Sequence, residues 1–298
     1  MDCIFEGVAT ALYTPFTQNG IDFEQFERCI DRQLSAKVDA LVFLGTTGES
    51  ATITHNERKQ IIEFAVSKLK GKLPIIVGAG SNCTKTAIEL SLQAKELGAD
   101  CVLSVTPYYN RCEQDGIFAH YKSISSSAKI PLICYNVPKR TGVNIEPKTA
   151  KNLCKIDYVV GLKEANTDLS HIKTLFSLVG NKMNVYSGSD ELTKDFLTLG
   201  AKGLISVASN IIPLKIKDFI SDFQKDYDVC NFDYNTFFNL LFCKINPIPV
   251  KYIASVLFGE DCIFRLPLTH PNLATQKYII SQLKTLGFNV FDKKTYKE

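Results

Sequence analysis

The sequence predicts a (β/α)8 barrel followed by a C-terminal helical region. Short apolar segments recur at intervals of roughly 20 to 35 residues, which is the length of one strand–helix unit. They read as continuous Val, Ile and Leu runs, as expected for parallel strands that are buried on both faces. About eight such units favour a closed barrel over an open sheet. The segments begin near Val8, Ala40, Pro74, Asp100, Ile130, Tyr158, Met183 and Gly203.

Amphipathic segments follow the predicted strands. Residues 54–69 carry apolar side chains at helical spacing, and Thr54 followed by Glu57 is a capping box at their start. Residues 84–97 form a second helical pattern, which Gly98 is expected to end. Each strand is therefore expected to be followed by a helix that packs against it.

The strand-like segments stop at Pro213. We therefore expect a barrel core in residues 1–212 and a helical region, residues 213–298, packed on it, with a loose end over residues 289–298. The predicted helices of this second region span residues 216–227, 232–244, 250–257 and 271–286.

Composition excludes several classes of protein. Of the 298 residues, 45% are hydrophobic and 22% charged, which is ordinary for a globular protein with a sizeable core. The net charge is only +3, and the lysines are scattered, so no nucleic-acid partner is expected. The N-terminus does not resemble a signal peptide, and no apolar stretch approaches the length of a membrane span.

The cysteines are predicted to be small core residues. There are ten of them, but the chain is too long to need a disulfide framework. No C-x-x-C pair exists and only four His are available, so a zinc site is not expected. Cys101 and Cys134 lie within apolar runs, as small hydrophobic side chains do. We expect a reducing, cytoplasmic location.

Lys163 ends one of the apolar segments. A lysine is almost never buried without a reason, and the C-terminal ends of barrel strands carry the active site. Desolvation lowers the pKa of an ammonium group, and a neutral amine attacks a keto group to form a Schiff base. The ordinary alternative is an edge-strand lysine that reaches water. The other strand ends favour the catalytic interpretation.

Two glycine-containing loops follow the second and third predicted strands. Residues 45–50 read Gly-Thr-Thr-Gly-Glu-Ser, where backbone N–H groups and hydroxyls suit a carboxylate, although a tight turn with an N-cap is the alternative. Residues 78–82 contain Gly-x-Gly, but the rest of the phosphate-loop pattern is missing. We favour a turn for this second loop.

Tyrosines and an arginine follow the next strands. Tyr108 and Tyr109 cannot both be core residues, and one packed ring with one surface ring is the alternative to a functional role. Tyr135 ends the strand beside that of Lys163, so its hydroxyl could move a proton. Arg140 lies on a loop where its planar fork suits a carboxylate, although it could also be a solvated surface cation.

Three of these motifs together resemble a known family. Residues 45–49, 135–142 and 161–164 are similar to the signatures of the dihydrodipicolinate synthase / N-acetylneuraminate lyase superfamily, which are pyruvate-dependent class I aldolases on a (β/α)8 barrel. The resemblance covers nearly the whole chain. It is strongest to the dihydrodipicolinate synthase branch, because the lyase branch typically has Ser at the position of Thr46 and lacks an Arg at that of Arg140.

The resemblance implies an activity and catalytic residues. Pyruvate would condense with L-aspartate 4-semialdehyde to give 4-hydroxy-tetrahydrodipicolinate, in the diaminopimelate pathway of lysine biosynthesis. Lys163 matches the imine-forming lysine. Tyr135, Thr46 and Tyr109 match a proton relay, in which Tyr109 reaches across a dimer interface. No metal or organic cofactor is implied, because the protonated imine is itself the electron sink.

It also implies substrate contacts and an assembly. Thr47 matches the residue that binds the pyruvate carboxylate, and Arg140 the residue that meets the carboxylate of the aldehyde. Gly188 and Ile205 match backbone contacts near the bound pyruvate. The implied assembly is a homotetramer, built as a dimer of dimers.

Many members of this family are inhibited by L-lysine in a cleft between subunits. This chain departs from the sensitive pattern, with Thr86 where sensitive members carry a Glu and Arg58 where they often carry a His. We expect little or no inhibition, unless a nearby carboxylate such as Glu57 replaces the missing one. The positions that match the cleft are Ser50, Ala51, His55, Asn82 and Tyr108.

Two other functions remain open at this point. A sister aldolase, such as N-acetylneuraminate lyase or a 2-keto-3-deoxy-sugar-acid aldolase, would keep Lys163 and Tyr135 without needing Arg140. A non-catalytic barrel that only binds a ligand is the other, and the complete set of Lys, Tyr, Thr and Tyr argues against it.

Overall fold

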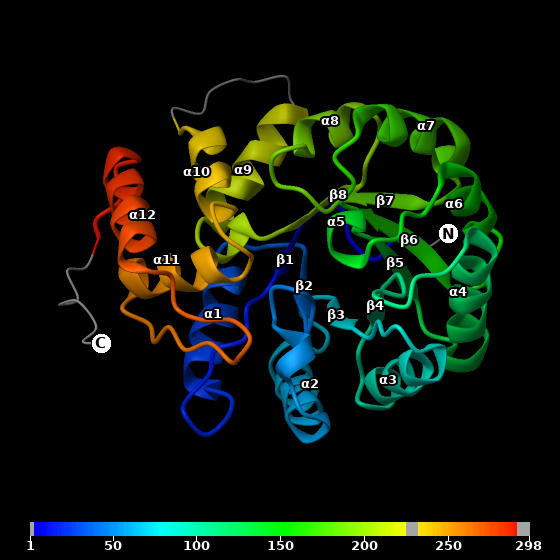
Figure 1. Ribbon diagram of the computed structural model, residues 1–298, viewed down its shortest axis with the longest axis horizontal. Coiled ribbons are helices and arrows are strands. Elements are labelled where there is room, and N and C mark those ends of the chain that lie inside the picture. Colours follow the sequence, from blue (N-terminus) through cyan, green and yellow to red (C-terminus); the bar gives the residue numbers. More distant parts are fainter. Residues whose placement is uncertain (1–2, 225–231, 291–298) are drawn as a thin grey trace.

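The computed structural model describes residues 3–224 and 232–290, and it confirms the predicted barrel. Eight parallel strands pair in chain order, and the eighth pairs with the first, which closes the sheet (Figure 1). Each strand begins close to its predicted start. The strands are β1 (Gly7–Ala11), β2 (Ala40–Phe43), β3 (Ile75–Gly78), β4 (Cys101–Val105), β5 (Leu132–Asn136), β6 (Val159–Glu164), β7 (Asn184–Ser187) and β8 (Gly203–Ser206).

Helices surround the barrel, with at least one after every strand (Figure 1). Short 3-10 helices η1 (Ser50–Thr52), η2 (Gly180–Lys182) and η3 (Ala208–Asn210) lie in the connections. The outer helices are α1 (Phe23–Ser35), α2 (His55–Leu69), α3 (Thr84–Glu96), α4 (Gln114–Ala128), α5 (Pro138–Thr141), α6 (Pro147–Leu153), α7 (Leu169–Val179), α8 (Thr193–Thr198) and α9 (Pro213–Gln224).

The predicted helix ends of α2 and α3 are confirmed. The Thr54 hydroxyl accepts a hydrogen bond from the Glu57 N–H, and the Glu57 carboxylate accepts one from the Thr54 N–H at 3.0 Å, which completes the capping box. Gly98 follows α3 with a φ of +98°, a conformation that favours glycine.

The C-terminal region forms three further helices, α10 (Tyr234–Leu241), α11 (Ile248–Phe258) and α12 (Leu273–Thr285), which lie together on one side of the barrel (Figure 1). Helix α9 follows β8 and packs against β1, so it takes the place of the eighth barrel helix. Helix α9 was assigned to the C-terminal region by the predicted boundary at residue 213, but it packs as part of the barrel. Of the predicted C-terminal segments, residues 225–227 and 291–298 lie outside the described residues.

The core has two layers. Inward-facing side chains of the strands fill the barrel, and outward-facing ones pack against the helices. At the N-terminal end of the barrel the ring of Phe5 stacks on that of Tyr186, with centroids 4.4 Å apart. Cys101 and Cys134 are completely buried, as predicted, and all cysteines of the described residues are free thiols. No described helix combines the length and apolarity that crossing a membrane requires.

Candidate active site

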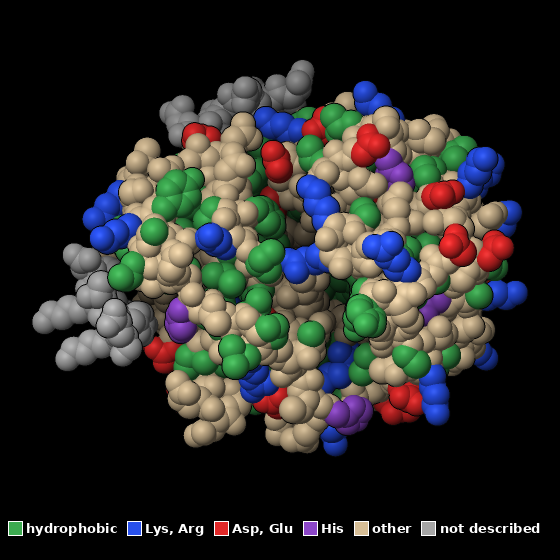
Figure 2. All heavy atoms as spheres, viewed as in Figure 1, with side chains coloured by type: hydrophobic (Ala, Val, Ile, Leu, Met, Phe, Trp, Pro, Cys, Tyr) green, Lys and Arg blue, Asp and Glu red, His purple; other side chains and the backbone are tan. Residues whose placement is uncertain are grey.

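A cavity of about 580 Å³ lies among the loops that follow the strands, and Figure 2 shows the hollow with Lys and Arg side chains around it. Its wall includes Thr46 after β2, Tyr135 near the end of β5 and Arg140 in α5. Asn246 and Pro247, which precede α11, complete the wall from the C-terminal region. The C-terminal helices therefore help to build the site.

Lys163 is buried at the end of β6, with 6% of its surface exposed. Its Nζ lies 4.5 Å from the centre of the Tyr135 ring. Burial lowers the pKa of Lys163 to about 8; the carboxylate of Asp190 opposes this shift and the charge of Arg140 adds to it. Near neutral pH a far larger share of Lys163 than of an ordinary lysine is therefore neutral. The fold therefore places an amine of lowered pKa inside the barrel.

Tyr135 is paired in register with Lys163 on the neighbouring strand. Its side chain is buried, which raises the pKa of its hydroxyl, while the charge of Arg140 and hydrogen bonding with Thr46 lower it. Thr46 and Arg140 thus both act on the phenol of Tyr135 beside the amine. This arrangement can deliver a proton to, and remove one from, an atom bonded to Nζ.

Thr47 and Arg140 are connected by Asn246. The Nδ2 of Asn246 donates to the Thr47 Oγ1 at 2.9 Å, and its backbone oxygen accepts from the Arg140 Nη2 at 3.0 Å. The peptide bond from Asn246 to Pro247 is cis. Sequence reasoning did not assign a role to Asn246; its only local signal was an Asn-Pro pair ahead of a helical pattern.

The remaining predicted pyruvate contacts are Gly188, directly after β7, and Ile205, on β8. A Cβ on Gly188 would lie 3.1 Å from the Lys163 Cε and 2.8 Å from the Ala165 Cβ, so glycine makes room for the lysine. The Gly188 N–H donates to the backbone oxygen of Glu164 at 2.7 Å, so it already has a partner within the protein. Ile205 is buried among the residues inside the barrel and does not line the cavity.

Asp190 is a residue of the site to which sequence reasoning gave no role. It is 1% exposed, and its charge acts on Lys163. Its carboxylate accepts from the Ser206 hydroxyl and from the Val207 N–H at 3.0 Å, which ties the end of β7 to that of β8. A carboxylate three residues after a strand end was the signal that could have identified it.

The two tyrosines after β4 both reach the surface. Tyr109 is 91% exposed and has a φ of +71°, and it does not line the cavity of its own chain. Tyr108 is 39% exposed and lines the cavity wall. The alternative with one packed ring is therefore wrong. Of the predicted relay, one chain brings together Thr46 and Tyr135 but leaves Tyr109 facing outwards.

Most residues of the predicted lysine cleft line the same cavity. They are Ser50, Ala51, His55 and Tyr108, and the two departures from the sensitive pattern, Arg58 and Thr86, line it as well. Asn82 does not line this cavity; its backbone oxygen accepts from the Asn110 Nδ2 at 3.0 Å.

Arg58 is held by the protein itself. It is 6% exposed, and its guanidinium donates to the backbone oxygens of Gly78 at 2.7 Å and Leu90 at 3.3 Å, and to the Gln93 Oε1 at 3.0 Å. Arg58 is therefore a fixed part of the cavity wall. No ion pair joins Arg58 to a carboxylate of the described residues. Burial lowers its pKa to about 10, so it is still charged at neutral pH.

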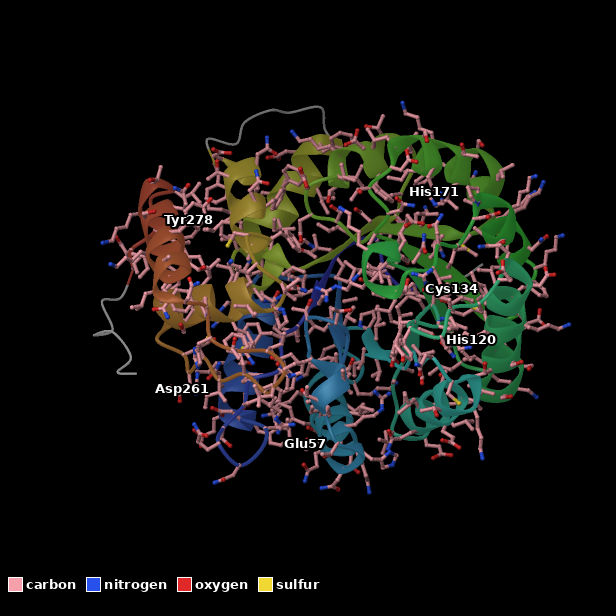
Figure 3. All side chains as sticks on the ribbon, in the orientation of Figure 1. Glu57, His120, Cys134, His171, Asp261 and Tyr278 are labelled. Carbon is pink, nitrogen blue, oxygen red and sulfur yellow. The ribbon has the colours of Figure 1, made fainter. Side chains whose placement is uncertain are left out.

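Glu57 is paired with an arginine of its own chain. Both of its oxygens accept from Arg265, one of them at 2.8 Å from Nη1, and Arg265 holds the pKa of Glu57 at about 2. Figure 3 shows Glu57 on α2, at the edge of the molecule. Its charge is already compensated.

A second lysine is buried, but in a different environment. The Nζ of Lys251 lies 2.6 Å from the Glu49 Oε1 and donates to the backbone oxygens of Thr14 at 3.1 Å and Ile263 at 2.6 Å. All three N–H groups of this ammonium are used, so it is a structural cation. Lys163, in contrast, has no carboxylate within ion-pair distance among the described residues.

The Gly-x-Gly segment at the end of β3 packs closely against neighbouring strands and loops. A Cβ on Gly78 would lie 2.0 Å from the Leu44 oxygen, and one on Gly80 would lie 2.4 Å from the Val105 N, so both glycines allow close packing of backbones. Within residues 3–224 and 232–290 no three His, Cys, Asp or Glu side chains are grouped so that they could hold a metal ion.

Comparison with known proteins points to one family. The profile of the dihydrodipicolinate synthetase family matches residues 4–286. The 4-hydroxy-tetrahydrodipicolinate synthase of Alkaliphilus oremlandii is 42% identical over 286 residues, which are 94% of this chain and 98% of that protein. The one from Methanocaldococcus jannaschii is 40% identical over 290 residues, covering 95% and 99%.

Solved structures agree with these relatives. The crystal structure of dihydrodipicolinate synthase from Thermotoga maritima has a TM-score of 0.90 at 38% identity, and the match covers 96% of this chain and 99% of that one. The enzyme from Cyanidioschyzon merolae, solved with lysine bound, has a TM-score of 0.88 at 34% identity, with the same coverage.

Proposed function

Because this chain belongs to the dihydrodipicolinate synthetase family and has the activity of a 4-hydroxy-tetrahydrodipicolinate synthase, we propose that it condenses pyruvate with L-aspartate 4-semialdehyde through a Schiff base on Lys163. The observation that carries this assignment is the buried amine of Lys163, with its lowered pKa, over the ring of Tyr135. A neutral amine inside a barrel is the nucleophile that this reaction needs.

The first half of the reaction forms the imine. The Lys163 Nζ attacks the keto carbon of pyruvate, and the resulting carbinolamine loses its oxygen as water. Tyr135 donates the proton that the departing hydroxyl takes, and Thr46, which hydrogen-bonds with it, passes protons to and from the phenol. The hydroxyl of Thr47, steadied by Asn246, binds the carboxylate of pyruvate.

The second half joins the two substrates. Loss of a methyl proton converts the imine to an enamine, whose carbon attacks the aldehyde carbon of the second substrate. The amino nitrogen of that substrate then attacks the imine carbon, closing the ring and releasing Lys163. Arg140 stands in the cavity wall, held at the Asn246 oxygen, where it meets the carboxylate of the aldehyde.

We infer that the working enzyme is an oligomer, with a dimer as its smallest active form and a tetramer as its complete assembly. The exposed ring of Tyr109 supports this inference, because a large aromatic side chain with 91% exposure is poorly used in an isolated chain. In a dimer it would complete the proton relay of Thr46 and Tyr135 in the neighbouring subunit.

The activity is tested by comparing two aldehyde partners for pyruvate. Purified enzyme is assayed with L-aspartate 4-semialdehyde and with N-acetylmannosamine at equal concentrations. We expect turnover with the first and none with the second, because Arg140 places a cation where a carboxylate enters. Preferred use of N-acetylmannosamine would instead assign the chain to a sister aldolase.

A further inference from the structure

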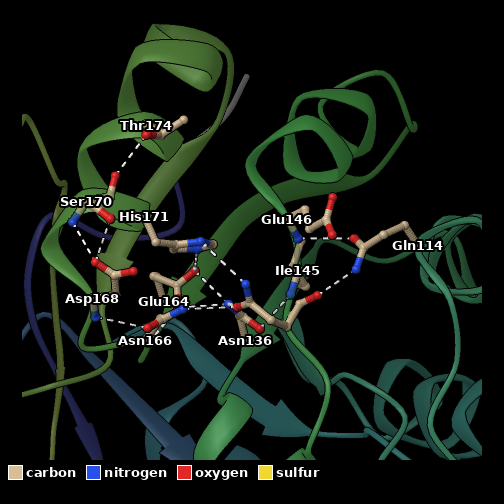
Figure 4. A network of polar contacts seen from close by, with 11 residues as sticks. Gln114, Asn136, Ile145, Glu146, Glu164, Asn166, Asp168, Ser170, His171 and Thr174 are labelled. Atoms are coloured by element: carbon tan, nitrogen blue, oxygen red, sulfur yellow. Dashed lines mark hydrogen bonds and ion pairs between the residues drawn. The ribbon is translucent and has the colours of Figure 1, made fainter.

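A second pair of residues lies directly behind Tyr135 and Lys163. The register of β5 and β6 matches Tyr135 with Lys163 and, one residue later, Asn136 with Glu164. Because side chains alternate along a strand, the first pair points into the barrel and the second points outwards, beneath the helices. Both Asn136 and Glu164 are fully buried. Figure 4 shows this outer pair and its surroundings.

The outer pair is joined by hydrogen bonds to the loops that follow both strands. The Nδ2 of Asn136 lies 2.9 Å from each carboxylate oxygen of Glu164. The Oδ1 of Asn136 accepts from the Ile145 N–H at 2.9 Å, and the Oε1 of Glu164 accepts from the Asn166 N–H at 2.6 Å. The pair therefore holds the loop after β5, which carries Arg140, as well as the loop after β6.

Asn144 and His171 close the network on its outer side. The Asn144 Oδ1 accepts from the Asn136 Nδ2 at 2.8 Å, and the His171 Nδ1 lies 3.4 Å from the Asn144 Nδ2 (Figure 4). The His171 Nε2 is 3.5 Å from the Glu164 Oε2. Among the described residues no Lys or Arg pairs with Glu164, so amide donors are its main partners. A buried carboxylate held in this way costs stability to retain.

The register of these strands needs such a fixed point. A slip of one residue would turn Lys163 out of the barrel. The ladder is not uniform: Leu132 pairs with Val159 but Ile133 pairs with Gly161, so β6 contains an extra residue at this place. Asn136 with Glu164 is the last paired step, at the end of the strands that carries the amine.

We propose that Asn136 and Glu164 are positioning residues for imine formation, which hold β5 and β6 in the register that places Tyr135 against Lys163. The proposal rests on the function assigned above. A misplacement of about 1 Å between reacting groups can cost up to about a hundredfold in rate. The negative charge of Glu164 also acts on the phenol and raises the pKa of Tyr135, which is consistent with this role.

The test exchanges the donor and the acceptor of the pair. Asn136→Asp sets one carboxylate against another and should slow imine formation, measured as borohydride-trapped pyruvate against time, by about ten- to a hundredfold. Adding Glu164→Gln restores one donor and one carboxylate in swapped positions, and the Asn144 amide can rotate to donate to the new Asp. The double variant should recover to within about threefold of the wild type, a rescue that a general loss of packing would not give.

The matched control is Glu260→Gln, which changes a buried carboxylate to an amide at a position that does not line the cavity, where Glu260 accepts from Tyr13 and Arg32. It should lower the melting temperature and leave the rate of imine formation unchanged. If Asn136→Asp does not fold, the rate of imine formation in Glu164→Gln alone tests whether the pair positions the reacting groups.

Two results would contradict these proposals. Wild-type rates and pH midpoints of imine formation in folded Asn136→Asp or Glu164→Gln, with only the melting temperature lowered, would show that the pair serves stability alone. Failure of the wild-type enzyme to trap pyruvate at Lys163 would overturn the proposed function itself and this inference with it.

Discussion

The Nζ of Lys163 lies over the ring of Tyr135, 4.5 Å from the ring centre, and the two residues are paired on neighbouring strands. The face of an aromatic ring attracts an ammonium group, which favours the charged form, whereas burial favours the neutral one. Burial is the largest influence, and it lowers the pKa of the lysine to about 8. The lysine therefore exchanges its proton close to neutral pH.

The burial of Lys163 should cost stability. Its pKa is about 8 in the folded chain and 10.5 in an exposed lysine, so below pH 8 the folded state holds the ammonium at a cost of about 3 kcal/mol. Between pH 8 and 10.5 the unfolded chain binds more protons, so stability rises with pH there. Lys163→Met should therefore be more stable than the wild type at pH 7, and the gain should vanish near pH 10.5. Thermal unfolding across this range measures it, and a gain independent of pH would contradict the assigned pKa.

Arg140 should separate the two halves of the reaction. Arg140→Ala should reduce use of the aldehyde by about ten- to a hundredfold, the value of a lost charged hydrogen bond. It should also raise the pH midpoint of imine formation, because the charge of Arg140 lowers the pKa of Lys163. Arg140→Lys is the matched variant: it keeps the charge, and hence the midpoint, but loses the planar fork. Equal damage to both half-reactions in Arg140→Ala would instead indicate that the residue supports the fold through Asn246.

Tyr109 should act in the neighbouring subunit. Chains with Tyr109→Phe and chains with Lys163→Ala, each nearly inactive alone, should regain activity when mixed into hybrid oligomers. One site of each hybrid then combines an intact lysine with a tyrosine from the other chain. The expected recovery is a fraction of the wild-type activity, measured after native mass spectrometry has identified the hybrids. Inactive hybrids would place Tyr109 outside any site.

L-Lysine should inhibit weakly or not at all. The cleft presents Thr86 and a buried, charged Arg58, and the nearby Glu57 is occupied by Arg265. Without a carboxylate for the second ammonium of the ligand, affinity should fall by about a hundredfold. Thr86→Glu should restore inhibition, and Thr86→Gln, of similar size but uncharged, should not. Half-inhibition of the wild type below about 1 mM would show that the cleft still binds lysine without that carboxylate.

Features that repeat along the chain could be predicted from the sequence, and contacts between distant segments could not. The eight strands and the place of Lys163 follow from short apolar runs and their ends, which are local patterns. Asn246 reaches Thr47 across 199 residues, and nothing near either residue indicates it. The hydrogen bonds between Asn136 and Glu164 depend on the register of β5 and β6, which only the assembled barrel defines.

The partners of charged side chains were equally hard to predict from the sequence. The sequence located Arg58 in the cleft but not its partners, because only the folded chain shows the backbone oxygens of Gly78 and Leu90 that hold it. It could not show that Glu57 would be paired with Arg265 either, since 208 residues separate them. Residue type indicates what a side chain can do, and its partners decide what it does.

The most direct test of the account is to trap the imine and locate it. The enzyme is treated with pyruvate and borohydride at pH 8, digested, and analysed by mass spectrometry, with Lys163→Ala as the control. The reduced pyruvate adduct should lie on the peptide that contains Lys163, and the equally buried Lys251, which is bound to Glu49, should be unmodified. An adduct on Lys251, or labelling that persists in Lys163→Ala, would contradict the assignment of Lys163 as the Schiff-base lysine.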